Sequence, residues 1–148
     1  MNPGSSRLLM VIAVLALAGI VVSSISLAHH YSASKTSFCD FGESFNCDIV
    51  NKSEYSTILG VPVSLIGIVG YAAVLMFATL YRSRSDSATI IFWGALAGLG
   101  FALYLTYIEA YVLTVWCILC LSSMFLILSI AVLSSIAMLQ QRRRLSTN

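Results

Sequence analysis

Four apolar stretches of membrane-spanning length dominate this sequence and limit what it can fold into. About 20 consecutive apolar residues suffice for one helix to cross a bilayer. Charged residues make up only 9% of the chain, against roughly 25% in an average soluble domain. We therefore predict an all-α membrane protein, a four-transmembrane-helix bundle that forms a single domain over residues 1–148. The predicted helices cover residues 8–28, 61–81, 88–108 and 115–139.

The first apolar stretch has a second interpretation. Arg7 precedes it and small residues lie near Ser26 and Ala28, as in a cleavable signal peptide. Its apolar run is longer than the core of about 7 to 15 residues that signal peptides have. We interpret it as a retained membrane anchor, and the alternative stays open.

The positions of the basic residues predict how the chain is oriented, because cytoplasmic loops carry an excess of Lys and Arg. Lys35 and Lys52 fall on one side of a four-span arrangement. All six arginines fall on the other: Arg7, Arg82, Arg84, Arg142, Arg143 and Arg144. We predict an inner-membrane, multi-pass protein with both termini in the cytoplasm and residues 29–60 in the periplasm. The net charge of +2 and the terminal arginines indicate anionic lipid as the partner, and not nucleic acid.

Residues 29–60 form the one long polar stretch. Some thirty residues are too few for a core of their own, so we expect this loop to cover the helix bundle as a lid. A short amphipathic helix over residues 48–59 is predicted, with Ile49, Tyr55, Ile58 and Leu59 toward the membrane.

All four cysteines fall on the same predicted side of the membrane. Cys39 and Cys47 lie in the loop, and Cys117 and Cys120 form a Cys-x-x-Cys pair at the start of the fourth helix. Three-residue spacing on a helix puts both sulfurs on one face, and the positive end of the helix dipole stabilises a thiolate. We predict a nucleophilic thiol at the membrane boundary.

A thiol relay accounts for two cysteine pairs at one membrane face. Thiols and disulfides exchange through mixed disulfides, so a mobile pair, Cys39 and Cys47, can meet a soluble protein while a fixed pair meets an electron acceptor. A helix bundle can hold an isoprenoid quinone between facing helices. Two structural disulfides or a soft metal bound by four thiolates remain alternatives.

Several other residues have two interpretations. We interpret His29 and His30 as residues at the membrane interface, with metal binding as the alternative. We interpret Glu109 as an acid solvated by lipid headgroups, with tuning of the Cys117 thiol as the alternative. Residues 51–53 form a glycosylation sequon. Among glycines within the spans, the favoured role of Gly67, Gly70, Gly94 and Gly98 is helix packing, with ligand clearance as the alternative.

The order of these motifs resembles the vitamin K epoxide reductase family over nearly the whole chain. The resemblance lies in Cys39 and Cys47 after a first helix, in the segment from Cys47 through Ser53 to residues 56–62, and in Cys117-Ile118-Leu119-Cys120 opening the last helix. It implies a four-helix bundle around a quinone, ubiquinone or menaquinone. Cys117 and Cys120 would form the redox centre, with Cys120 facing the quinone and Cys117 exchanging with Cys47, while Cys39 meets the partner.

The resemblance also places the quinone near Ser56, Leu59, Cys120 and Met124. Animal members have an Asn and a Tyr where this chain has Ser56 and Met124. Serine can still donate a hydrogen bond, whereas methionine cannot, which argues against epoxide reduction.

The partner implied for bacterial members is a DsbA-like or other thioredoxin-fold protein. It is expected to be a separate chain here, because no such domain follows Asn148. The leading interpretation is thus a membrane thiol-disulfide oxidoreductase that oxidises a periplasmic thioredoxin-fold protein and reduces a quinone, supporting disulfide bond formation. Vitamin K epoxide or quinone reduction and non-catalytic binding of a soft metal are the alternatives.

Overall fold

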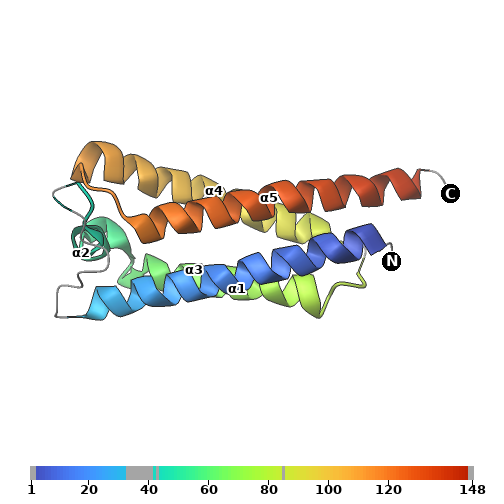
Figure 1. The fold of residues 1–148 in the computed structure, drawn as a ribbon, viewed down its shortest axis with the longest axis horizontal. Coiled ribbons are helices and arrows are strands. Elements are labelled where there is room, and N and C mark those ends of the chain that lie inside the picture. The colour runs from blue at the N-terminus through green and yellow to red at the C-terminus, as the bar shows by residue number, and fades with distance from the viewer. Residues whose placement is uncertain (1–2, 33–41, 43, 85, 147–148) are drawn as a thin grey trace.

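The computed structural model describes residues 3–32, 42, 44–84 and 86–146. Four long helices lie side by side (Figure 1). They are α1 (Pro3–Tyr31), α3 (Val63–Thr79), α4 (Ser87–Ile108) and α5 (Ile118–Leu145). Three helical segments are long and apolar enough to cross a membrane: Ser6–Tyr31, Ser87–Leu113 and Ile118–Arg143. The prediction of a helical membrane protein is therefore confirmed, with three spans. A fourth span through α3, which is apolar but has 17 residues, stays a prediction.

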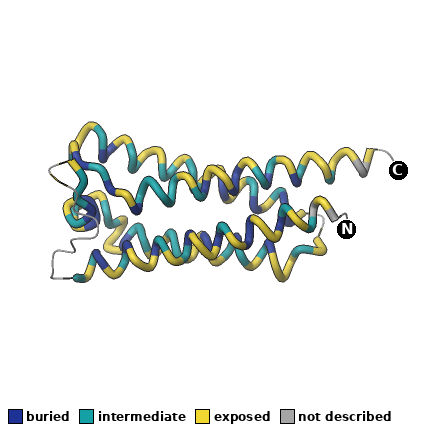
Figure 2. The backbone as a smooth tube through the Cα atoms, viewed as in Figure 1, coloured by how far each residue is buried: buried dark blue, intermediate teal, exposed yellow. Residues whose placement is uncertain are grey.

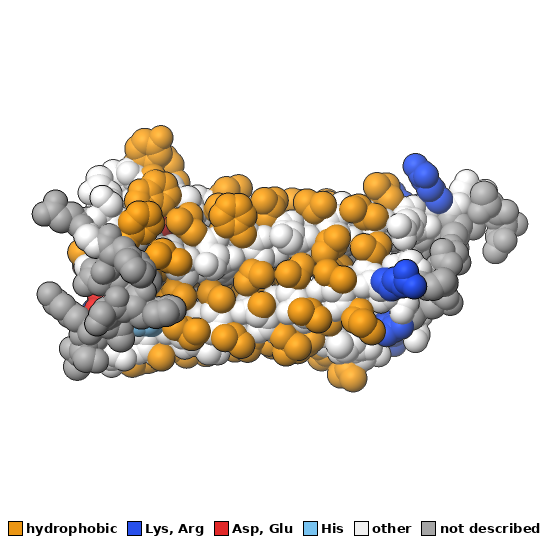
Figure 3. Space-filling view, in the orientation of Figure 1, with side chains coloured by type: hydrophobic (Ala, Val, Ile, Leu, Met, Phe, Trp, Pro, Cys, Tyr) orange, Lys and Arg blue, Asp and Glu red, His pale blue; other side chains and the backbone are white. Residues whose placement is uncertain are grey.

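The helices bury small and branched side chains against one another. α1 packs on α3 and α5, and α4 packs on α5 and α3. Ile12 and Ala16 of α1, Ile91 of α4 and Ile130 of α5 belong to one core cluster. Exposed residues occur along all four long helices (Figure 2). Much of the surface visible in Figure 3 is apolar, as a surface that faces lipid must be. Exposed large apolar side chains include Met10, Val14, Trp93, Phe125 and Leu139.

The segment between α1 and α3 differs from the prediction. A short helix, α2 (Cys47–Asn51), is followed by a 3-10 turn, η1 (Glu54–Ser56), and a two-stranded antiparallel hairpin, β1 (Thr57–Ile58) and β2 (Val61–Pro62). The predicted helix over residues 48–59 is therefore wrong beyond Asn51. Its continuation is replaced by local bonds, because the Ser53 hydroxyl donates to the Val50 carbonyl. Leu59 and Gly60 then take positive φ values of 53° and 82° and form the tight turn of the hairpin.

The two ends of the bundle differ in character. One end carries α2 and the connection between α4 and α5, and the other carries both termini and the connection between α3 and α4 (Figure 1). The Arg and Lys side chains visible in Figure 3 gather at the end with the termini. The charge asymmetry expected from the sequence thus coincides with the two ends of the fold.

Candidate active site

The site begins where α4 changes its winding. After Ile108 the chain makes a π-helical turn, η2 (Glu109–Leu113), and the backbone N–H groups of Thr114 and Val115 both donate to the Glu109 carbonyl. Thr114 has a left-handed φ of 53°, which ends the turn and directs the chain back toward α5. Glu109 is consequently buried, with 1% of its surface exposed. The interpretation of Glu109 as a headgroup-solvated acid is wrong, because the π turn rotates the side chain toward the bundle interior.

Glu109 is joined to the start of α5. The Cys117 backbone N–H donates to Glu109 Oε2 at 3.1 Å, and the Cys117 carbonyl accepts from Leu121 as the first bond of the helix. Cys117 is therefore the residue that caps α5, and Cys120 lies in its first turn, as the sequence predicted. A carboxylate oxygen of Glu109 and the sulfurs of Cys117 and Cys120 all lie within 4.8 Å of one another.

A short backbone bridge brings the loop cysteine Cys47 to Cys117. The Trp116 N–H donates to the Ser44 carbonyl at 2.9 Å, and the Asn46 N–H donates to the Trp116 carbonyl at 3.2 Å. These bonds form a parallel bridge between Phe45 and Trp116. Cys47 and Cys117 are both buried and share one apolar cluster. The bridge thus fixes the first residue of α2 beside the start of α5.

The cysteines differ in redox state. Cys47 takes part in a disulfide, whereas Cys117 and Cys120 are free thiols. Cys39 lies outside the described residues. With Cys47 oxidised, the four-thiolate metal site considered from the sequence is not formed in this state. The group that could hold a soft metal is instead Glu109, Cys117 and Cys120.

The pKa of the Cys117 thiol is lowered from its ordinary value. The main cause is a hydrogen bond from the Cys120 thiol, which stabilises the Cys117 thiolate, while burial and the negative charge of Glu109 act in the opposite direction. A lowered pKa raises the fraction of thiolate, which is the form that attacks a disulfide. Cys117 is therefore more often in the thiolate form that attacks a neighbouring disulfide than an ordinary cysteine would be.

A cavity of about 500 Å³ adjoins these groups and is bounded by α1, α2, η1, α3, α4 and α5. Its volume is in the range of small-molecule sites, about 300 to 1,000 Å³. Cys120 and Glu109 line it, and so does Ser56, one of the residues predicted to contact a quinone. Cys117 is not among the lining residues. The two thiols of the Cys-x-x-Cys pair therefore have different neighbours, Cys117 the loop cysteine and Cys120 the cavity.

All four glycines considered from the sequence line the cavity, and two of them also have a close neighbour on another helix. A Cβ atom on Gly67 would lie 2.9 Å from the Ser23 hydroxyl, and one on Gly98 would lie 3.3 Å from Ile127, so these two permit close helix packing. Gly70 and Gly94 have no such neighbour within 4 Å and line the cavity. These two glycines keep the cavity wide.

Two of the predicted quinone contacts do not reach the cavity. Leu59 sits at the tip of the hairpin and is fully exposed, because the turn directs it away from the bundle. Met124 is not among the lining residues, and its sulfur accepts from the Thr106 hydroxyl at 3.5 Å. Of the four predicted quinone contacts, Ser56 and Cys120 line the cavity and Leu59 and Met124 do not; quinone binding itself stays a prediction.

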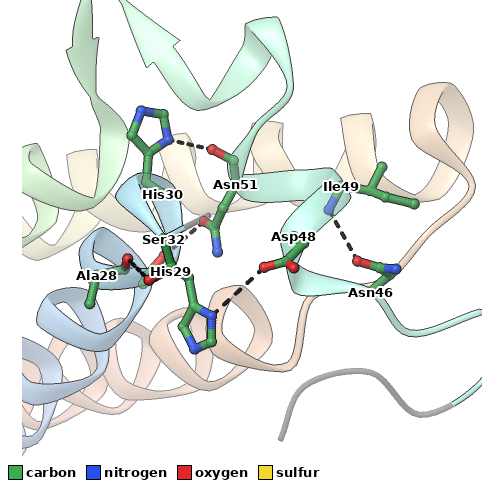
Figure 4. Close-up of polar contacts among 9 residues, drawn as sticks. Ala28, His29, His30, Ser32, Asn46, Asp48, Ile49 and Asn51 are labelled. Carbon is green, nitrogen blue, oxygen red and sulfur yellow. Dashed lines mark hydrogen bonds and ion pairs between the residues drawn. The ribbon is translucent and has the colours of Figure 1, made fainter. Parts of the chain in front are cut away.

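A polar clasp ties α2 to the end of α1 (Figure 4). The Ser26 hydroxyl donates to Asn51 Oδ1 at 2.8 Å, and His30 Nδ1 donates to the Asn51 carbonyl. His29 Nδ1 lies 3.8 Å from Asp48 Oδ1. His29 is buried, so reading it as an interface residue is wrong. Asn51 is buried too, and the sequon reading fails because a glycan cannot be attached to a side chain enclosed between α1 and α2.

Sequence reasoning considered Asn51 only as part of a sequon and did not predict that Glu109 is buried. The available signal for Glu109 was its position eight residues before Cys117, within an otherwise apolar stretch. An ionisable residue within a membrane segment is a functional candidate by default. No comparable signal marked Asn51, because its burial depends on the fold of the loop.

Comparison with known families identifies the family of the chain. The sequence model described as the vitamin K epoxide reductase family matches residues 10–135. The match includes α3, α4, most of α1 and α5, and the cysteines at positions 47, 117 and 120. The resemblance noted from the cysteine motifs is confirmed: the chain belongs to the vitamin K epoxide reductase family, whose members are oxidoreductases.

Proposed function

We propose that this protein is a membrane thiol-disulfide oxidoreductase that oxidises a periplasmic thioredoxin-fold protein of the DsbA-like kind and reduces a quinone. The observation that carries the proposal is the arrangement of three cysteines. Cys117 is buried in one cluster with Cys47, while Cys120 lines the cavity. Such an arrangement allows electrons to pass from the loop to the cavity by exchange between neighbouring sulfurs.

The relay has three steps within the chain. The reduced partner first reduces the disulfide that includes Cys47, with Cys39 as the proposed point of entry. A Cys47 thiolate then attacks Cys117 in a Cys117–Cys120 disulfide, forming a Cys47–Cys117 bond and releasing the Cys120 thiolate. Closure of the loop disulfide releases Cys117 and leaves both inner cysteines reduced. The inner pair is free in the structure.

The cavity has properties that suit a quinone. Its wall is mainly apolar, as the isoprenoid tail requires, and Ser56 and Asn51 are among its polar lining residues. The Ser56 hydroxyl already donates to the Ser53 carbonyl at 2.7 Å. Asn51 Nδ2 is buried and has no hydrogen-bond partner among the described residues, so it is available to a carbonyl oxygen. A bound quinone would supply an acceptor for two electrons and two protons. Asn51 would hold it by a hydrogen bond, and the cavity walls at Ser56, Gly70 and Gly94 by contact.

The proposed orientation follows from the two ends of the bundle. Arg82 and Arg84 lie in the connection between α3 and α4, at the end that also holds the termini (Figure 1). The excess of positive charge on this end supports a cytoplasmic location for it. The end with the cysteines would then face the periplasm, where disulfides form. In this arrangement α3 would be the fourth span, its 17 residues covering about 26 Å.

Quinone reduction by the purified protein tests this proposal. We expect wild-type protein, given a reduced DsbA-like protein and ubiquinone or menaquinone, to turn over. Cys120→Ser should lower that rate by at least about 10³-fold, because the sulfur at the cavity is lost. Cys39→Ser should block the protein donor but spare turnover with a small dithiol that reaches the inner pair. Equal loss with both donors in Cys39→Ser would contradict the relay order.

Binding of a soft metal is the second candidate, because Glu109, Cys117 and Cys120 form a compact set of ligands. Thiolate and carboxylate ligands of this kind suit zinc. Stoichiometric metal in the purified protein, with inner thiols that resist alkylation until a chelator is added, would favour it. A folded wild-type protein that reduces no quinone would point the same way.

A further inference from the structure

Glu109 has one carboxylate oxygen that capping does not explain. Oε2 accepts from the Cys117 N–H. Oε1 is buried without a hydrogen bond of ordinary geometry among the described residues, and the side chain that interacts with the carboxylate is the Cys120 thiol. Burying a charged or polar atom without a partner costs free energy. Such an atom in a native fold calls for an explanation in terms of function or a bound group.

A structural role alone would not need a carboxylate. A glutamine oxygen could accept from the Cys117 N–H equally well, since that bond needs only an acceptor. The feature that an amide would not supply is a second oxygen able to carry a proton. Glu109 also lines the cavity together with Cys120, and its carboxylate lies within 4.8 Å of both sulfurs. The carboxylate is therefore placed between the thiols and the cavity.

The proposed reaction creates a need for proton transfer at this place. When the inner pair is oxidised, an S–S bond forms between Cys117 and Cys120, and two electrons leave for the quinone. If Cys117 starts as a thiolate and Cys120 as a thiol, one proton leaves Cys120. Two protons are needed to complete the quinol. The second proton is drawn from water at the loop end of the bundle, so that atoms and charges balance.

We propose that Glu109 is a catalytic proton-transfer residue that accepts the Cys120 proton as the Cys117–Cys120 disulfide forms and passes it to a quinone oxygen. This inference rests on the function proposed above and assigns a role that the cysteines alone cannot fill. General acid-base groups placed in this way contribute about 10²- to 10⁴-fold to a rate.

Besides Glu109 and Cys120, the titratable side chains that line the cavity among the described residues are His30, Tyr55 and Tyr71. The His30 Nδ1 proton is donated to the Asn51 carbonyl, and the Tyr71 hydroxyl is bonded to Ser123 of α5. Tyr55 lines the cavity from η1. Besides the two thiols themselves, the charged group that acts on Cys117 and Cys120 is Glu109.

The test compares Glu109→Gln with Glu54→Gln, the same change at an exposed acid at the same end of the bundle. Quinone reduction driven by a small dithiol should fall at least about 10²-fold in Glu109→Gln and remain at the wild-type rate in Glu54→Gln. The melting temperature should be unchanged in both, because glutamine keeps the acceptor for Cys117. Equal rates for Glu109→Gln and wild type would overturn the inference while leaving the proposed function intact.

A second measurement needs no quinone. The negative charge of Glu109 raises the pKa of the Cys117 thiol, so the thiolate absorbance of the reduced inner pair should titrate at lower pH in Glu109→Gln than in Glu54→Gln. An unchanged titration would show that Glu109 does not face the thiols as a carboxylate, and would overturn the inference. Failure of wild-type protein to reduce any quinone would instead remove the proposed function, and this inference with it.

Discussion

At the scale of single residues, the two thiols of the Cys-x-x-Cys pair are made unequal by their surroundings. Cys117 is fully buried and receives a hydrogen bond from the Cys120 thiol. Cys120 is partly exposed and lines the cavity. One sulfur is thus prepared for disulfide exchange within the protein, and the other for contact with a molecule in the cavity.

The lowered pKa of Cys117 can be tested by removing its hydrogen-bond donor. In protein with Cys39 and Cys47 replaced by Ser, we expect Cys120→Ala to move the Cys117 titration to higher pH, since the thiolate loses its stabilising bond. Cys120→Ser keeps a hydroxyl donor and should retain most of the lowered value. Ultraviolet absorbance of the thiolate against pH measures both. Identical titrations in the two variants would contradict the assigned cause.

Residue identity drew attention to the cysteines, and it did not predict the burial of Glu109. Cysteine pairs at fixed spacing indicate chemistry whatever the fold, so Cys47, Cys117 and Cys120 could be singled out from the sequence. The burial of Glu109 depends on a π turn and on a left-handed Thr114. Such backbone features arise from how the α4–α5 connection closes, and no local sequence pattern reports them.

At the scale of elements, α3 and α4 define the width of the cavity through Gly70 and Gly94. Gly70→Phe should place a ring in the open space there and raise the KM for quinone by about 10-fold or more, which corresponds to about 1.4 kcal/mol. The melting temperature should hold, because nothing is displaced. Steady-state kinetics over a range of quinone concentrations measure the effect.

Gly19→Ala is the matched control for this element-level prediction. A Cβ atom at Gly19 would lie 2.4 Å from the Tyr71 ring, so α1 and α3 would have to separate. We expect a loss of stability of about 1 to 3 kcal/mol, seen as a lower melting temperature. A Gly70→Phe variant with unchanged KM, or one destabilised as much as Gly19→Ala, would contradict the cavity assignment.

The elements themselves were predicted unevenly. The long helices follow from apolar length, which is a strong signal for membrane segments. The loop between α1 and α3 was harder, because a five-residue helix and a two-residue hairpin turn have little periodicity to detect. Their placement depends on contacts made far along the chain, such as the bridge between Phe45 and Trp116.

At the scale of the whole molecule, the candidate redox groups and the arginine side chains lie at opposite ends of the bundle. The described cysteines, Glu109 and the α2 clasp lie at one end, and the arginines of the α3–α4 connection lie at the other (Figures 1 and 3). The cavity extends from the cysteine end along α4 as far as Ile90, about 27 Å by helical rise from Ile108. This layout lets a soluble donor and a membrane-dissolved acceptor approach one relay from different directions.

Trapping the exchange intermediate tests the central claim of a Cys47-to-Cys117 relay most directly. In Cys120→Ser, a Cys117 thiolate that attacks the loop disulfide at Cys47 has no inner partner to resolve the product. After free thiols are blocked, mass spectrometry of proteolytic fragments should show a Cys47–Cys117 disulfide and an alkylated Cys39. A Cys39–Cys117 link, or a Cys117 that stays free while the loop disulfide persists, would contradict the account.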